Sequence, residues 1–300
     1  MTTSATHPDV VGTTYPFGPC HTEAMIADLS RRAYDYRTHV LRMVNGRKSG
    51  HIGGAFSCAE ILTALYFHHL RIDPAHLDWS ERDRLVFSKG HACAMLYTVL
   101  AHRGFFPVDE LPTFRALNSR LQGHPEPQKT PGVEVAAGPL GHGVAIGAGM
   151  ALAARMDGSK RKVYVILGDG ELNSGVIWEG VMTAAKFALD NLKVIVDCNG
   201  VQQTGMTRHV MPTEPIAEKW AAFNWHVIEI HGHNMAQILD ALDRADEVHG
   251  RPVVIIARTT KGKGVSFMED SPAWHGGVPD AAQFEAALAE LNEGASAWKV

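Results

Sequence analysis

The sequence predicts an α/β fold with three layers, in which a mostly parallel sheet is covered by helices on both faces. Short runs of consecutive apolar residues alternate along the chain with longer amphipathic segments. The run KVYVIL at 162–167 is the clearest of the short ones. A strand that is apolar throughout is buried on both faces, as in a parallel sheet between two layers of helices.

The individual elements follow from local patterns. Apolar residues three or four apart predict a helix over 22–44 that ends at Asn45-Gly46. A second helix is predicted to begin at Ser57, which forms a capping box with Glu60, after a glycine-rich loop over 48–54. Further helices are expected over 92–102, 141–155, 178–189 and 280–291 and after an Asn234 cap, and strands over 84–88, 162–167, 192–197, 226–230 and 252–258.

Two segments fall outside this alternation. Residues 1–21 are polar and are expected to form a flexible arm before a single domain over 22–300. Residues 107–138 contain several prolines and little periodicity, which predicts a long ordered excursion over the edge of the sheet. A segment of that length inside a compact domain usually serves a function.

Composition excludes several classes of protein. The 300 residues are 45% hydrophobic and 20% charged, so they can bury a large core, which excludes a disordered chain. The net charge of −4 comes from mixed charges with no basic footprint for nucleic acid. No apolar stretch is long enough for a membrane span, and no signal peptide precedes the domain, so we expect a cytoplasmic protein. The four cysteines are widely spaced and form neither a disulfide framework nor a zinc knuckle.

Polar residues follow two strands where each is predicted to end. Gly168-Asp169-Gly170 follows the strand at 162–167, and Asn199 follows the strand at 192–197. The carboxyl ends of parallel strands share one edge, where open α/β sheets bind ligands. The tripeptide alone is equally typical of a turn, but a carboxylate and an amide oxygen together favour a magnesium site that bridges to a diphosphate. Glycine at 168 and 170 lets the backbone approach such phosphates closely.

This pattern resembles the fingerprint of thiamine-diphosphate enzymes, in which GDG is followed further along the chain by Asn. Within that group the sequence is similar to the transketolases. Matching segments occur in family order over about residues 20–280: Lys48-Ser49-Gly50-His51, Ser88-Lys89-Gly90-His91, Gly123-His124-Pro125-Glu126, Gly138-Pro139-Leu140-Gly141-His142-Gly143, Gly168-Asp169-Gly170-Glu171-Leu172, Lys261-Gly262-Lys263-Gly264 and Trp274-His275-Gly276.

The resemblance implies roles for particular residues. Asp169, Asn199 and the backbone carbonyl of Val201 correspond to ligands of Mg²⁺ or Ca²⁺. The residues implied in cofactor binding are His91, Gly138, Leu140, Gly168, Asp169, Gly170, Glu171, Asn199, Gln203, Lys261 and His275. The family's catalytic histidines, which bind or protonate the sugar around the cofactor's reactive carbon, correspond to His51, His91, His124 and His275. An unperturbed pKa near 6.5 suits imidazole to proton transfer near neutrality.

Most other histidines, including His68 and His69, are expected to be structural or solvated. Three positions depart from the family pattern. Ser174 replaces a glutamate that belongs to an acidic relay between paired active sites, which leaves that proton communication open. The segment Ile52-Gly53-Gly54 replaces proline and small polar residues, and His142 stands where Gln is common. The latter two changes lie near the expected site and fit an unusual substrate.

The implied reaction is the transfer of a two-carbon ketol unit from a ketose, expected to be a sugar phosphate, to an aldose acceptor, with thiamine diphosphate as cofactor. In transketolases a second, pyrimidine-binding domain supplies a glutamate to the cofactor, and no segment of this chain is large enough to be that domain. We therefore expect the N-terminal subunit of a split transketolase, in a hetero-tetramer with a C-terminal subunit.

Other functions stay open at this point. A deoxyxylulose-phosphate synthase-like or 2-oxoacid dehydrogenase-like subunit has the same fingerprint, and a non-catalytic binding subunit has the same fold. A nicotinamide dehydrogenase is disfavoured, because the glycines at 141, 143 and 147 have the wrong spacing and follow no strand. The segment 261–264 likewise lacks the spacing of a Walker nucleotide site.

Overall fold

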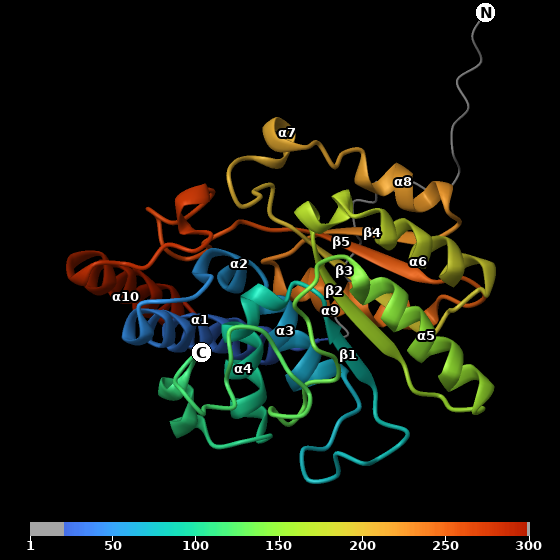
Figure 1. Ribbon diagram of the computed structural model, residues 1–300, viewed down its shortest axis with the longest axis horizontal. Coiled ribbons are helices and arrows are strands. Elements are labelled where there is room, and N and C mark those ends of the chain that lie inside the picture. The colour runs from blue at the N-terminus through green and yellow to red at the C-terminus, as the bar shows by residue number, and fades with distance from the viewer. Residues whose placement is uncertain (1–20, 299–300) are drawn as a thin grey trace, which may run out of the picture.

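A five-stranded parallel sheet forms the centre of the computed structural model, which describes residues 21–298 (Figure 1). The strands are β1 (Arg84–Phe87), β2 (Val163–Gly168), β3 (Leu192–Cys198), β4 (His226–His231) and β5 (Val253–Arg258). They are ordered β1-β2-β3-β5-β4, and every neighbouring pair is parallel. The predicted α/β fold is confirmed, with a sheet that is parallel throughout. Residues 1–20 of the predicted arm lie outside the described part of the chain.

Alternate residues of each strand enter two separate hydrophobic cores. In β2, Tyr164 and Ile166 face one core while Val163 and Val165 face the other. The first core is closed by α1 (Glu23–Arg47), α2 (Ile52–Ser57), α3 (Ala59–Ala64), α4 (Cys93–Arg103), α9 (Met235–Glu247) and α10 (Ala281–Ser296). The second is closed by α5 (His142–Met156), α6 (Gly175–Lys186) and α8 (Ile216–Ala222). The three predicted layers follow from this alternation.

The helices near the N-terminus differ from the prediction. Helix α1 begins after an N-cap at Thr22 as expected, but it continues to Arg47 and ends where Lys48 adopts a left-handed conformation (φ 50°). The predicted loop over 48–54 is wrong in its second half, because α2 begins at Ile52. Ser57 is also not a helix cap: it ends α2, is fully buried, and donates its hydroxyl to Asp197 at 2.6 Å.

The remaining elements are short. A π-helical turn (Leu65–His69) continues α3, and short 3₁₀ helices cover 90–92, 108–113, 169–173 and 272–274. Helices α7 (Thr207–Val210) and α8 were not predicted, because they are too short to show a helical period. None of the helices over residues 21–298 is long and apolar enough to cross a membrane.

The excursion over 107–138 is mostly irregular, as predicted, and its two halves lie on different parts of the domain. The first half buries Leu111 and Phe114 in the core beneath α1 and α4. The second half lies beside the edge strand β1, where Glu134 pairs with Arg82 and Arg84. It also passes against the turn after β1, where a Cβ atom on Gly90 would lie 1.6 Å from the carbonyl oxygen of Ala137. The segment is therefore fixed by close backbone contact.

The parallel arrangement decides where the polar loops go. All five strands end at the same edge of the sheet, so the segments after β1, β2, β3 and β5 are neighbours. These segments carry the residues 88–91, 169–171, 199–203 and 259–261, which include most of the motifs singled out from the sequence.

Candidate active site

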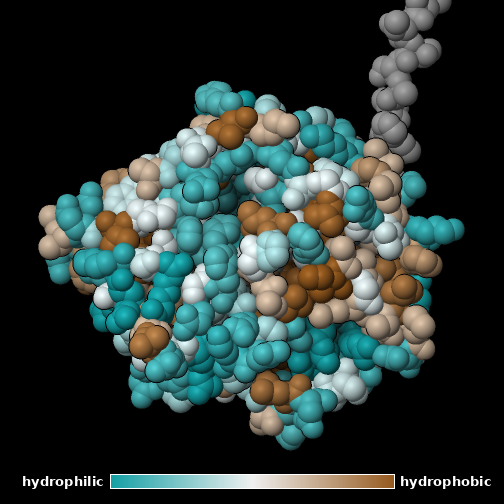
Figure 2. Space-filling model, viewed as in Figure 1, coloured by the Kyte–Doolittle hydropathy of each residue, from teal (hydrophilic) through white to brown (hydrophobic). Residues whose placement is uncertain are grey.

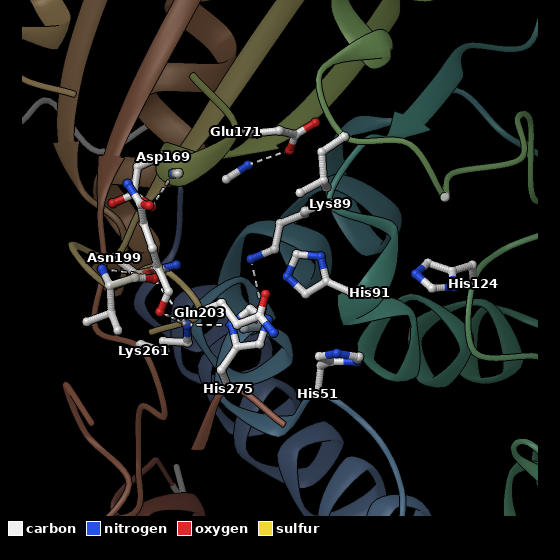
Figure 3. A pocket seen from close by; sticks show the side chains of 17 residues that line it. His51, Lys89, His91, His124, Asp169, Glu171, Asn199, Gln203, Lys261 and His275 are labelled. Carbon is white, nitrogen blue, oxygen red and sulfur yellow. Dashed lines mark hydrogen bonds between the residues drawn. The ribbon is translucent and has the colours of Figure 1, made fainter. Parts of the chain in front are cut away.

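A cavity of about 380 Å³ opens at the carboxyl edge of the sheet (Figure 3). Every site residue predicted from the sequence lines it: His51, His91, His124, Gly138, Leu140, Gly168, Asp169, Gly170, Glu171, Asn199, Val201, Gln203, Lys261 and His275. Gly54, Lys89 and Gln202 also line it and were not predicted as site residues. Of the departures from the family pattern, Ile52 is buried within α2 and His142 is exposed outside the cavity lining.

Asp169 and Asn199 are buried oxygen donors at the ends of β2 and β3. The two carboxylate oxygens of Asp169 accept one hydrogen bond each, from the backbone N–H of Gly170 (2.8 Å) and of Gly200 (2.6 Å). Burial and the nearby charge of Asp197 raise the pKa of Asp169 to about 6, against the opposing effect of these amides. The Asn199 side-chain oxygen accepts from the N–H of Val201 at 3.1 Å. Each oxygen keeps a lone pair for a cation.

Lys261 occupies the floor beside these donors. Its ammonium donates to the carbonyls of Val201 (3.1 Å) and Gln202 (3.3 Å) and to Nδ1 of His275 (2.8 Å). Burial and the nearby Lys89 lower the pKa of Lys261 to about 8. Since Nδ1 of His275 accepts, the neutral ring carries its proton on Nε2. The Val201 carbonyl, which accepts from Lys261, points toward a positive charge.

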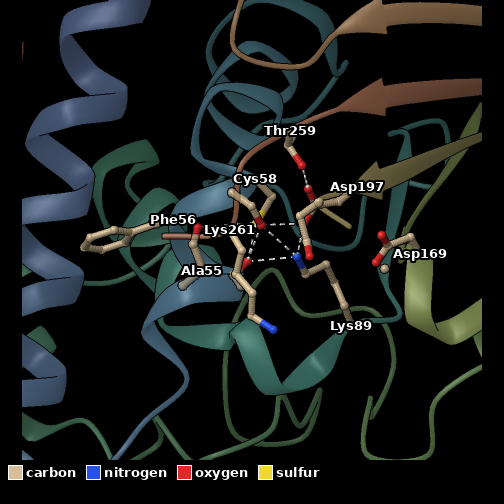
Figure 4. Close-up of polar contacts among 12 residues, drawn as sticks. Ala55, Phe56, Cys58, Lys89, Asp169, Asp197, Thr259 and Lys261 are labelled. Carbon is tan, nitrogen blue, oxygen red and sulfur yellow. Dashed lines mark hydrogen bonds and ion pairs between the residues drawn. The ribbon is translucent and has the colours of Figure 1, made fainter. Parts of the chain in front are cut away.

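A buried ion pair joins the ends of β1 and β3 beneath the cavity (Figure 4). Lys89 pairs with Asp197, and neither side chain is more than 1% exposed. Asp197 also accepts hydroxyl hydrogen bonds from Ser57 and Thr259, and Lys89 donates to the Gly54 carbonyl at 2.8 Å. Although burial opposes both charges, the pairing raises the pKa of Lys89 and lowers that of Asp197. Both groups are therefore charged at neutral pH.

Three histidines meet around the mouth of the cavity. The rings of His51, His91 and His275 lie 5.2–5.3 Å apart, and His91 stacks on His275. Burial and the surrounding cations, Lys89 for His91 and Lys261 for His275, lower the pKa of His91 to about 2 and of His275 to about 4. All three rings are neutral at pH 7, because the pKa of His51 is lowered as well. The fourth, His124, is exposed and stands apart from them on the excursion (Figure 3).

The carboxylate of Glu171 accepts its hydrogen bonds from other groups of the protein. Its carboxylate accepts from the Ser88 hydroxyl and from the backbone N–H groups of Gly141 (2.7 Å) and Gly168 (3.0 Å). It thereby ties the turn after β1 and the start of α5 to the end of β2. This contact braces the wall of the cavity.

The glycines at 138 and 168 leave room inside the cavity. Apart from the chain neighbours, a Cβ atom at either position would meet no atom of the described residues within 4 Å, and both glycines line the cavity. Nδ1 of His51 is buried and has no hydrogen-bond partner within residues 21–298. A diphosphate held through a divalent cation fits this cavity. The cavity offers open backbone, a ring nitrogen without a partner and oxygen donors with free lone pairs. Fold and cavity together are those of a diphosphate-binding domain of a thiamine-diphosphate enzyme.

Comparison with known proteins specifies the family. Residues 30–292 match the thiamine diphosphate binding domain of transketolase. The chain is 44% identical over 267 residues to one of the subunits of the apulose-4-phosphate transketolase of Actinobacillus succinogenes, and the match covers 89% of this chain and 96% of that protein. It is 42% identical over 266 residues to the SqwG subunit of the 6-deoxy-6-sulfo-D-fructose transketolase of Clostridium sp., with 89% and 97% covered.

Solved transketolases have the same fold. A transketolase mutant from Pichia stipitis in complex with xylulose-5-phosphate superposes with a TM-score of 0.82 at 29% identity, over 91% of this chain and 44% of that one. The Campylobacter jejuni transketolase gives 0.78 at 32% identity, over 90% and 48%. The chain thus spans less than half of these solved chains. It belongs to the transketolase family, as an N-terminal subunit of the split type, and is part of a ketol transferase that uses thiamine diphosphate.

We predict that the Lys89–Asp197 pair is essential for stability. Lys89→Met leaves a buried carboxylate without its cation, and it should lower the free energy of unfolding by about 3–5 kcal/mol. Lys263→Met is the matched control, because Lys263 pairs with Glu269 at 3.1 Å on the surface and should cost less than about 1 kcal/mol. Urea unfolding followed by circular dichroism measures both. Equal losses in the two variants would contradict the prediction.

Proposed function

We propose that this chain holds the diphosphate end of thiamine diphosphate in a two-subunit transketolase, which moves a two-carbon ketol unit from a ketose to an aldose. The observation that carries the proposal is the convergence of the predicted metal, cofactor and histidine positions on one cavity. The meeting of this particular set of residues in one cavity favours a thiamine-diphosphate enzyme over other classes of enzyme.

The cation site is assigned to the oxygens of Asp169 and Asn199 and to the Val201 carbonyl, with Mg²⁺ as the ion and Ca²⁺ as a substitute. Three protein oxygens of this kind suit magnesium, which takes its other ligands from phosphate and water. Gly168 and Gly170 border the phosphates, and Gln203, Lys261 and His275 also contact the cofactor. Gly138, Leu140 and His91 complete the contacts to the cofactor, with Glu171 as the brace behind them.

Thiamine diphosphate, when bound, supplies an electron sink that allows a carbon–carbon bond next to a carbonyl to break. The chain's own contribution is to bind and orient the sugar. The neutral rings of His51, His91 and His275 donate or accept hydrogen bonds at sugar hydroxyls without adding charge beside the cation. His124, at the exposed rim, moves a proton to or from the carbonyl or hydroxyl of the reacting sugar.

The substrate class is a ketose with an anionic end. Two relatives of nearly the same length are named as transketolase subunits for apulose-4-phosphate and for 6-deoxy-6-sulfo-D-fructose. The first sugar carries a phosphate and the second a sulfonate. The proposed anionic substrates are consistent with a cytoplasmic location of this enzyme. The free, buried cysteines Cys58, Cys93 and Cys198 are compatible with a reducing compartment.

The partner is a C-terminal subunit that carries the pyrimidine-binding domain, in an assembly with two copies of each chain. A relative covered almost from end to end is named as one subunit of its transketolase, which implies a second subunit in that enzyme. Apolar side chains also gather on the surface over α5 and α6 (Figure 2). Met156 at the end of α5, Met182 in α6 and Phe187 just after α6 are all exposed. A patch of this kind favours association with another chain.

We predict that ketol transfer requires both subunits. The chain should be purified alone and together with the subunit encoded beside its gene, and both preparations assayed with phosphorylated, sulfonated and uncharged ketoses. Only the pair, supplied with thiamine diphosphate and Mg²⁺, should turn over, and the anionic ketoses should be preferred. Robust activity of the chain by itself would overturn the two-subunit proposal, and release of carbon dioxide would point to another thiamine-diphosphate reaction.

Asp169→Ala should weaken the metal-dependent binding of thiamine diphosphate more than about tenfold, since alanine cannot offset the charge of the cation. Calorimetry on the assembled two-subunit enzyme measures this affinity. Asp157→Ala removes an exposed carboxylate at the end of α5 and is the control, with no expected change. Unchanged affinity in the Asp169 variant would show that the cation site is wrongly assigned.

His124→Ala should lower kcat about 10²–10⁴-fold, the effect of a lost general acid or base, and leave cofactor affinity nearly unchanged. His142→Ala is the matched control, because that histidine is exposed but lies outside the cavity lining. Steady-state kinetics and calorimetry on the assembled enzyme separate the two quantities. The role of His124 would be refuted by parallel losses of turnover and affinity, or by no loss of either.

A further inference from the structure

A group of nitrogen and oxygen ligands lies far from the cavity, at the opposite edge of the sheet. One ligand atom from each of His21, His68 and Asp243 lies within 4.8 Å of the other two. His21 precedes α1, His68 lies in the π-helical turn after α3, and Asp243 lies in α9. Three segments that are distant in sequence therefore meet at one point.

The position follows from neighbouring contacts. Asp246, one turn further along α9, pairs with Lys162 just before β2. The carbonyl of Ala245 likewise accepts from Lys193 near the start of β3. These contacts place the end of α9 at the amino ends of the strands, whereas the cavity lies at their carboxyl ends. The cluster has no part in holding the cofactor.

The contact between His21 and Asp243 has the geometry of two ligands rather than of a hydrogen bond. Nε2 of His21 lies 3.0 Å from Oδ2 of Asp243, and the His21 side chain is only 10% exposed. Yet this buried nitrogen makes no hydrogen bond, either to that oxygen or to any other described group. Neighbouring ligands on one tetrahedral ion lie about 3.3 Å apart at bond lengths near 2.0–2.1 Å, without pointing at each other.

His68 completes the arrangement from the solvent side. Its ring lies edge-on to that of His21, with centroids 5.0 Å apart and an interplanar angle of 87°. The side chain is exposed, which leaves an ion a path to the cluster.

His69 supports the carboxylate from behind. Its Nδ1 lies 3.8 Å from Oδ1 of Asp243, while its Nε2 is 2.9 Å from the Tyr164 hydroxyl and 3.2 Å from Asp246. The ring is thus held by partners on β2 and α9 and faces the second oxygen of Asp243. Fixed outer contacts of this kind orient the ligands of metal sites.

We propose that His21, His68 and Asp243 bind one Zn²⁺ ion, with water as the fourth ligand, and that the ion fastens the segment before α1 to helix α9. Two imidazoles and one carboxylate suit zinc, whereas Mg²⁺ and Ca²⁺ require oxygen ligands. The ion takes no part in ketol transfer, because the site lies across the sheet from the cavity. It is independent of the proposed transketolase function.

The test is a zinc titration of the full-length chain without an affinity tag, after treatment with a chelator, in competition with a chromophoric zinc indicator. The chain should bind one ion tightly, and Asp169→Ala should retain that ion, which separates this site from the cavity. His68→Ala and Asp243→Asn should each weaken binding more than about tenfold. His76→Ala is the matched control, since His76 is an exposed histidine that pairs with Asp73 elsewhere on the surface.

Thermal unfolding gives a second readout that does not depend on activity. Zn²⁺ should raise the Tm of the unmodified chain and of His76→Ala, but not of His68→Ala or Asp243→Asn. Asp243→Asn keeps the size of the side chain and so covers the case in which the alanine variant fails to fold. Binding that is equally tight in the ligand variants, or that is lost equally in His76→Ala, would overturn the proposal and assign the zinc to surface histidines in general.

Discussion

The buried pair of Lys89 and Asp197 is the interaction on which the site depends. It connects the ends of β1 and β3, and the hydroxyls of Ser57 and Thr259 add α2 and β5 to the same carboxylate. A charge pair with no access to water is stable only when its geometry is maintained, because each partner alone would be strongly disfavoured. Four segments that carry cavity residues are thus held in register by one carboxylate. His91 and Asn199 closely follow Lys89 and Asp197 in the sequence, so the contact fixes the segments that carry them.

The same pair sets the electrostatics of the cavity. Lys89 contributes to the depressed pKa values of His91, His275 and Lys261. Asp197, from the other side, contributes to the raised pKa of Asp169. As a result, three neutral imidazole rings share the cavity with the Asp169 carboxylate, whose charged form a nearby cation would stabilise. Such an arrangement keeps the three imidazole rings uncharged beside the buried charged groups of the cavity.

Features that follow from the parallel strands can be predicted from the sequence. Features that depend on contacts between residues distant in the sequence cannot. Asp169 and Asn199 could be placed together because adjacent strand ends share an edge, and family motifs supplied the histidines. Asp197 gave no such signal, since its partners Lys89 and Ser57 are far away in the chain and a buried aspartate at the end of a strand has no local pattern. The predicted helix cap at Ser57 is wrong for the same reason, because its partner Asp197 is distant in the sequence. The glycines at 53 and 54 predict a loop but lie in α2, where a Cβ atom on Gly53 would come within 2.8 Å of the Trp274 carbonyl oxygen.

The contact between Gly90 and the Ala137 carbonyl limits how this enzyme can be altered. The excursion over 107–138 carries His124 and Gly138, and its length makes it an obvious segment to exchange in order to change substrate scope. Its backbone, however, fits against a residue that can have no side chain, in the turn that also carries His91. A graft from a relative would therefore succeed only if the turn after β1 were transferred with it. For protein engineering, the two segments are a single module.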